Sequence, residues 1–141
     1  MIATKPKNNQ QTIKESIIIN GIGLHSGEHV ELKMEPAEAD NGIKFIRVDL
    51  KQNNIVEAIW SNVSETLLST TISNSYGLKI STIEHLMSAL SGLHIDNLNI
   101  YLNAAEVPIM DGSSRPFVDI IESVGIKKQN KKRKLLNVKK V

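Results

Sequence analysis

The spacing of the apolar residues changes near residue 83, and this change constrains the fold more than any other feature. Residues 28–35 (EHVELKME) alternate between apolar and charged side chains, which is typical of a strand with one buried face. From Ile83 to Leu93 the apolar residues recur at intervals of three and four, which predicts an amphipathic helix. A chain with both periods must build a sheet and a helix whose apolar faces cover each other.

The same two patterns recur along the rest of the chain. Further strands are expected at residues 11–19, 43–50, 55–60, 67–73, 78–80 and 97–102. A second helix is expected at roughly residues 116–124, with Ser114 as its cap and Gly125 at its end. Strands and helices do not alternate regularly. The pattern therefore predicts an α+β two-layer sandwich, in which a mixed or antiparallel sheet carries two helices on one face.

The length and the charge distribution suggest how the chain is divided. A chain of 141 residues with 40% hydrophobic residues can bury one core, which we expect within residues 1–126. Residues 127–134 (KKQNKKRK) are typical of a basic, solvated linker. Residues 135–141 resemble the first strand of a second domain that is cut short.

The formal net charge of +2 hides a strong asymmetry. Residues 1–126 hold 9 basic and 15 acidic side chains, whereas residues 127–141 hold 8 basic and none acidic. An acidic body makes nucleic acid an unlikely partner for the folded part. The sequence lacks cysteine, a long apolar run and a signal-like N-terminus, so we expect a cytoplasmic protein without disulfides or a transmembrane segment.

The candidate site lies in STIEHL, residues 81–86. Glu84 and His85 fall in the first helical turn, opposite the apolar stripe. One interpretation is a capping box formed by Ser81 and Glu84, with His85 at the surface. The other is that His85 binds a metal and Glu84 acts as a general base. Because a catalytic zinc needs about three protein ligands, this pair alone would be an incomplete site.

Two other segments carry side chains of interest. HSGEH (25–29) matches the metalloprotease pattern H-x-x-E-H, but Gly27 and the strand that follows exclude the helix which that pattern requires. His25 is either a turn residue or part of a cleft wall. Asp111 in MDGSSRPF is either a turn former or a catalytic acid.

Three longer motifs resemble one enzyme family. They are GIGLHSGEHVELKMEPA (21–37), STIEHLMSALSGLHIDN (81–97) and EVPIMDGSSRPFV (106–118). They occur in the order and spacing of the UDP-(3-O-acyl)-N-acetylglucosamine deacetylases, the zinc amidases of lipid A biosynthesis. The resemblance runs from about residue 10 to the end of the chain. It implies two similar α+β domains with the active site between them.

The resemblance also implies roles for individual residues. His85 would be a Zn²⁺ ligand, and Glu84 would be the general base that takes a proton from the attacking water. The first domain's wall of the substrate cleft would be formed by Leu24, His25, Leu67, Leu68 and Ser69. The family's other zinc ligands, an H-x-x-x-D pair, belong to a second domain and have no counterpart in this sequence.

The expected function is therefore one half of a zinc-dependent hydrolase. Its substrate would be a UDP-linked acylated amino sugar, from which the N-acetyl group is removed. We expect this chain to be inactive alone, unless a separate chain supplies the second domain. The alternative is a non-catalytic α+β module whose basic tail binds RNA or an anionic surface.

Overall fold

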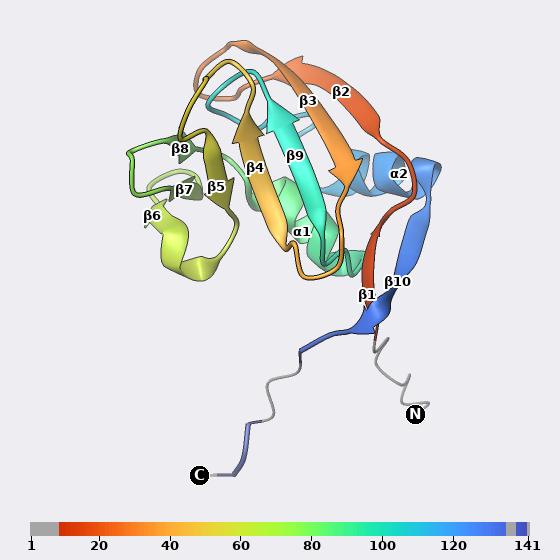
Figure 1. Cartoon of the computed structure of the whole chain (residues 1–141). Coiled ribbons are helices and arrows are strands. Elements are labelled where there is room, and N and C mark those ends of the chain that lie inside the picture. Colours follow the sequence, from red (N-terminus) through yellow and green to blue (C-terminus); the bar gives the residue numbers. More distant parts are fainter. Residues whose placement is uncertain (1–8, 135–137, 141) are drawn as a thin grey trace.

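The computed structural model describes residues 9–134 and 138–140 (Figure 1). The strands are β1 (Asn9–Ile13), β2 (Ile17–Ile22), β3 (His29–Pro36), β4 (Ile43–Arg47), β5 (Ile55–Glu57), β6 (Val63–Glu65), β7 (Thr71–Ser73), β8 (Lys79–Ile80), β9 (Leu98–Leu102) and β10 (Ile126–Lys132). The helices are α1 (Glu84–Gly92) and α2 (Arg115–Val124), with a short 3₁₀ turn, η1, at Trp60–Asn62.

A five-stranded sheet forms one layer, and the two helices form the other. The strand order is β2-β3-β9-β4-β5, and only the β4–β9 pair is parallel. Both helices lie behind this sheet, on the same face (Figure 1). The prediction of an α+β fold with a mixed sheet is confirmed.

The hydrophobic core lies between the sheet and the helices. Along β3, Val30, Leu32 and Met34 are buried while the residues between them are more exposed, as the alternation predicts. The helices contribute Leu86, Ala89, Leu90, Phe117 and Ile121. Gly125 ends α2 with φ +80°, as expected, but the side chain of Ser114 makes no capping hydrogen bond.

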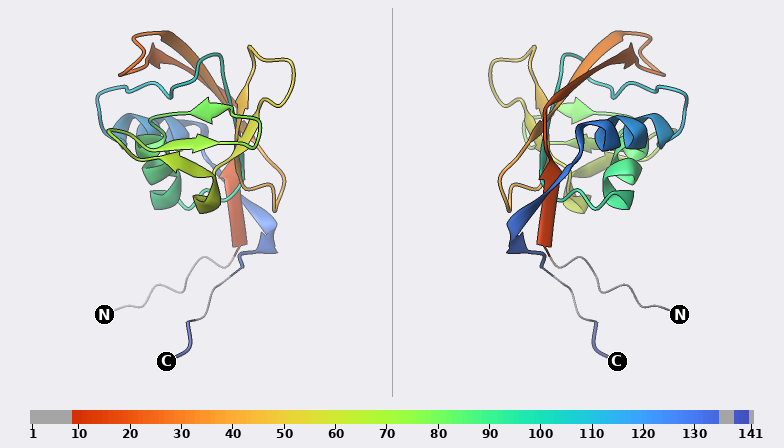
Figure 2. Two further views of the ribbon diagram at one scale, coloured as in Figure 1. Left: turned by 90° about the vertical axis from the view of Figure 1, so that its left-hand side faces the viewer. Right: turned by 90° about the vertical axis from the view of Figure 1, so that its right-hand side faces the viewer.

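A three-stranded sheet, β6-β7-β8, covers the side of the helices next to β5 (Figure 2). The strand predicted at residues 67–73 is wrong over most of its length, because only Thr71–Ser73 forms β7. Leu67 to Ser69 are loop residues, and Leu68 adopts a left-handed φ of +63°. All three residues of β6 are exposed, so its sequence carries no alternation of buried and exposed positions.

The predicted basic linker is instead a strand. Residues 126–132 form β10, which pairs antiparallel with β1 from Ile13↔Ile126 to Asn9↔Lys132. The strand predicted at residues 11–19 is correspondingly two strands, because the chain leaves β1 at Lys14 before it joins the main sheet as β2. The predicted start of a second domain, residues 135–141, lies largely outside the described residues.

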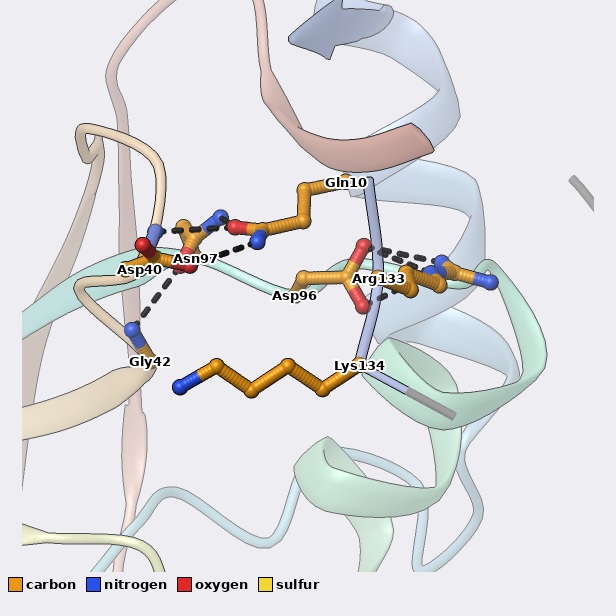
Figure 3. A pocket seen from close by; sticks show the side chains of 7 residues that line it. All are labelled: Gln10, Asp40, Gly42, Asp96, Asn97, Arg133 and Lys134. Carbon is orange, nitrogen blue, oxygen red and sulfur yellow. Dashed lines mark hydrogen bonds and ion pairs between the residues drawn. The ribbon is translucent and has the colours of Figure 1, made fainter. Parts of the chain in front are cut away.

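Buried amides attach β10 to the main domain. Asn97 is 1% exposed, and its side-chain N–H groups donate to Gln10 Oε1 at 2.8 Å and to Gln129 Oε1 at 2.7 Å. The Asn97 oxygen accepts the Gly42 N–H at 2.8 Å (Figure 3). Since buried amides are costly when unpaired, this network selects one position for β10. Arg133 adds an ion pair with Asp96 beside it.

We expect Asn97→Ala to lower the free energy of unfolding by about 1–3 kcal/mol, because Gln129 Oε1 and the Gly42 N–H, both half-buried, lose their hydrogen-bond partner. The measurement is urea unfolding followed by circular dichroism. Asn130→Ala, on the exposed side of β10, is the matched control and should change the stability little. Equal stability of the two variants would contradict the importance of this network.

Candidate active site

Glu84 faces a neighbouring loop rather than the end of its own helix. Its Oε2 accepts the backbone N–H of Thr70 at 3.0 Å. The N-cap position of α1 is occupied by Ile83, and no side chain caps it. Ser81 is instead paired with Glu106 in a short parallel bridge. The capping-box interpretation of Ser81 and Glu84 is therefore wrong.

His85 follows Glu84 on the first turn of α1 and is half-buried. Its Nδ1 is buried and has no hydrogen-bond partner among the residues that the structure describes. A buried ring nitrogen without a partner is unfavourable, unless a proton donor or a metal ion occupies its lone pair. This atom therefore fits a metal ligand. In residues 9–134 and 138–140, however, no group of three His, Cys, Asp or Glu side chains could hold a metal ion.

Asp111 lies in the electrostatic neighbourhood of His85. Hydrogen bonds from the Ser113 hydroxyl and backbone N–H, at 2.8 and 2.9 Å, hold the pKa of Asp111 below its ordinary value. The nearby His85 lowers this pKa further by a smaller amount. Asp111 thus forms a turn, which was one of its two predicted roles, and it lies near enough to His85 for the two groups to interact electrostatically.

A buried carboxylate joins two of the segments that carry site residues. Glu106 is 2% exposed. It accepts the backbone N–H of His25 at 3.1 Å, that of Ser26 at 2.9 Å, and the hydroxyl of Thr82 at 2.8 Å. The sequence analysis did not identify Glu106, although an acid between the apolar residues of AAEVPI was a usable signal.

Burial raises the pKa of Glu106, because the charged form is less solvated. The hydrogen bonds from Ser26, His25 and Thr82 together outweigh this effect, so the net pKa lies below the ordinary glutamate value. Glu106 is therefore charged at neutral pH. No lysine, arginine or histidine in the described part of the chain forms an ion pair with it, so these hydrogen bonds stabilise the charge.

The expected cleft-wall residues lie on loops that are connected to the start of α1. The Thr70–Glu84 hydrogen bond connects the 67–70 loop, and Glu106 connects the turn that holds His25. Leu24, Leu67 and Leu68 are 58%, 80% and 84% exposed, His25 is exposed, and Ser69 is half-buried. The side chains of His25, Glu84 and His85 make no hydrogen bond with one another among the described residues.

Three of the six non-glycine residues with a left-handed φ in the described part of the chain lie in this region. Leu68, Thr82 and Met110 have φ values of +63°, +56° and +55°. Each left-handed residue costs about 1–2 kcal/mol, and the cost is highest for a β-branched residue such as Thr82. Leu68 precedes the Thr70 contact, Thr82 precedes Glu84, and Met110 precedes Asp111. Strained residues of this kind often cluster at functional sites.

We expect Gly23→Ala to destabilise the fold by about 1–3 kcal/mol, because a Cβ at position 23 would lie 2.5 Å from Glu106 Oε2. Thermal unfolding provides the measurement. Gly92→Ala is the matched control, since its Cβ meets no atom within 4 Å and it lies in α1. Gly92→Ala should stabilise the protein by about 0.4–1 kcal/mol. If Gly23→Ala left the melting temperature unchanged, Glu106 would not be closely packed against the turn.

Glu106 also predicts a pH dependence of stability. Because its folded-state pKa is lowered, the carboxylate stabilises the fold above the unfolded glutamate pKa of about 4.3, and this contribution is lost as pH falls through the folded-state pKa. The difference in melting temperature between the wild type and Glu106→Gln should therefore shrink as pH is lowered from neutral. The matched control is Glu15→Gln at an exposed position, which should change the melting temperature little. A difference in melting temperature that does not change with pH would contradict a lowered pKa of Glu106.

Comparison with known proteins agrees with the motifs. The family model LpxC, UDP-3-O-acyl N-acetylglycosamine deacetylase, matches residues 10–141. The UDP-3-O-acyl-N-acetylglucosamine deacetylase of Hahella chejuensis is 52% identical over 131 residues, and those of Shewanella pealeana and Marinobacter nauticus are each 47% identical. Each alignment covers 93% of this chain and 43% of the relative, so the chain spans less than half of the relatives' length. The chain belongs to the UDP-3-O-acyl N-acetylglycosamine deacetylase family.

Proposed function

We propose that this chain forms the first half of a zinc-dependent deacetylase that removes the N-acetyl group of UDP-(3-O-acyl)-N-acetylglucosamine. The observation that carries the proposal is the buried Nδ1 of His85, which has no partner among the described residues, in the residue that directly follows Glu84. The names of the relatives indicate the substrate class. The division into a first domain and the beginning of a second is part of the same proposal.

His85 is the residue of this chain that would hold the zinc ion. Bound zinc would polarise the acetyl carbonyl and lower the pKa of water, which makes water a nucleophile near neutral pH. A catalytic zinc takes about three protein ligands. The described residues offer no such group, so the remaining ligands would come from a second domain or from a separate chain. We therefore expect this chain by itself to bind zinc weakly and to hydrolyse no substrate.

Glu84 would act as the general base. One carboxylate oxygen accepts the Thr70 N–H, and this bond fixes the orientation of the carboxylate. The other oxygen can then accept a proton from the attacking water. The oxygen of that water would attack the acetyl carbonyl, and the C–N bond would break as the nitrogen takes up the proton held by Glu84, which gives acetate and a free 2-amine. The backbone contact positions the base without occupying both of its oxygens.

The exposed loops would form one wall of the substrate cleft. Leu24, Leu67 and Leu68 present apolar surface on segments that are connected to Glu84 directly or through Glu106. His25 and Ser69 supply polar groups on the same loops. We propose that these five residues contact the UDP-linked acylated amino sugar.

The alternative of a basic module has less support. Within β10 and just after it, Lys131 pairs with Asp40 and Arg133 pairs with Asp96, so part of the positive charge is neutralised inside the protein.

Among the described residues, no helix combines the length and the apolar composition that a membrane crossing requires. We propose a cytoplasmic enzyme on the strength of the family.

The proposal can be tested with a chimaera. In this chimaera, the present chain replaces the corresponding 43% of the Hahella chejuensis deacetylase. We expect the chimaera to hydrolyse the substrate. Glu84→Gln should keep its zinc content but lower kcat by about 100-fold or more, because the base is lost. His85→Gln should lose both zinc and activity.

His29→Gln is the control, since His29 is exposed at the start of β3 and should affect neither zinc content nor kcat. Metal analysis and acetate release are the two measurements. A Glu84→Gln chimaera with undiminished kcat, or a His85→Gln chimaera with full zinc content, would refute these assignments.

A further inference from the structure

Glu106 has no role in the proposed chemistry, yet its carboxylate contacts both sides of the candidate site. A buried charge is expensive, and an apolar side chain of similar size often stabilises a fold as well or better. Its two oxygens accept donors from two segments at once: the N–H groups of His25 and Ser26, and the hydroxyl of Thr82. A glutamine has only one acceptor oxygen, so it could accept from one segment only, and the Thr82 hydroxyl would have to accept from the glutamine amide if the turn kept its contacts.

On one side, Glu106 determines where His25 lies. The 23–27 turn is closed by the hydrogen bond from Gly27 N–H to the Gly23 carbonyl at 2.9 Å. The His25 side chain is exposed and makes no hydrogen bond within the described residues, so its backbone alone fixes its position. The contacts of that backbone with Glu106, at 3.1 and 3.2 Å, anchor the turn to the protein.

On the other side, Glu106 holds the segment that begins α1. Thr82 is β-branched and left-handed, a conformation that persists only when the surroundings impose it. Its hydroxyl donates to Glu106 Oε1 at 2.8 Å. The N–H groups of Ser81 and Val107 form backbone hydrogen bonds between the same two segments. Glu84 lies only two residues beyond Thr82, so the direction of the first helical turn depends on this contact.

We propose that Glu106 is a positioning residue, which fixes His25 relative to Glu84 and His85 through one shared carboxylate. Its catalytic meaning rests on the proposed function. The positional link itself does not, because it is a property of this chain without metal or substrate.

The test uses the 141-residue chain and NMR, with Glu106→Gln, Thr82→Val and the charge-matched control Glu15→Gln. Glu106→Gln should shift the amides of His25, Ser26 and Thr70, and the imidazole resonances of both His25 and His85. Thr82→Val keeps the carboxylate and removes only the helix-side contact. It should shift the Thr70 amide and the His85 imidazole, and leave the amides of the turn nearly unchanged. Glu15→Gln should shift none of these signals.

A lower melting temperature without a shift of the Thr70 amide or the His85 imidazole would reduce Glu106 to a stabilising residue and overturn the proposal. If Glu106→Gln does not fold, the Thr70 amide and His85 imidazole shifts of Thr82→Val alone decide whether Glu106 positions the start of α1. In the chimaera, Glu106→Gln should lower kcat by roughly 10- to 100-fold with unchanged zinc content. An inactive parent chimaera would count against the proposed function, whereas the NMR result would still decide the positional link.

Discussion

Three hydrogen-bond donors converge on the buried carboxylate of Glu106 and hold together the segments that carry the candidate site. The sheet and the helices provide the scaffold, but the loops that carry His25 and the start of α1 do not share a core. They are connected by donors that converge on one charge. The absence of a Cβ at Gly23 allows the turn to approach that charge closely.

The sequence predicted the parts of the structure that are governed by apolar periodicity. The α+β class, the alternation of β3 and the two helices follow from where apolar side chains must be buried. Strand β10 was mistaken for a linker because it is held by β1 and by amides such as Asn97 and Gln129, and not by an apolar face. Polar networks leave no periodic signal in a sequence.

The candidate site, like the fold, was only partly predictable from the sequence. The motifs led to the prediction that Glu84 and His85 are site residues, which stays a prediction, whereas the spacing of Ser81 and Glu84 suggested a cap that the structure does not form. The actual partner of Glu84 is the backbone of Thr70, and any residue other than proline at position 70 would supply the same N–H. A contact with the backbone of a distant loop cannot be inferred from residue types. Glu106 was missed because its partners are far away in the sequence.

The β1–β10 ribbon has a consequence for the order in which the chain can fold. Asn9 pairs with Lys132, so the earliest described strand finds its partner in almost the last part of the domain to be synthesised. Until β10 has left the ribosome, the backbone of β1 has no strand beside it, and an unpaired strand is prone to wrong associations. The fold therefore cannot be completed before residue 132 has left the ribosome, and pairings between such distant segments are intrinsically slow to form.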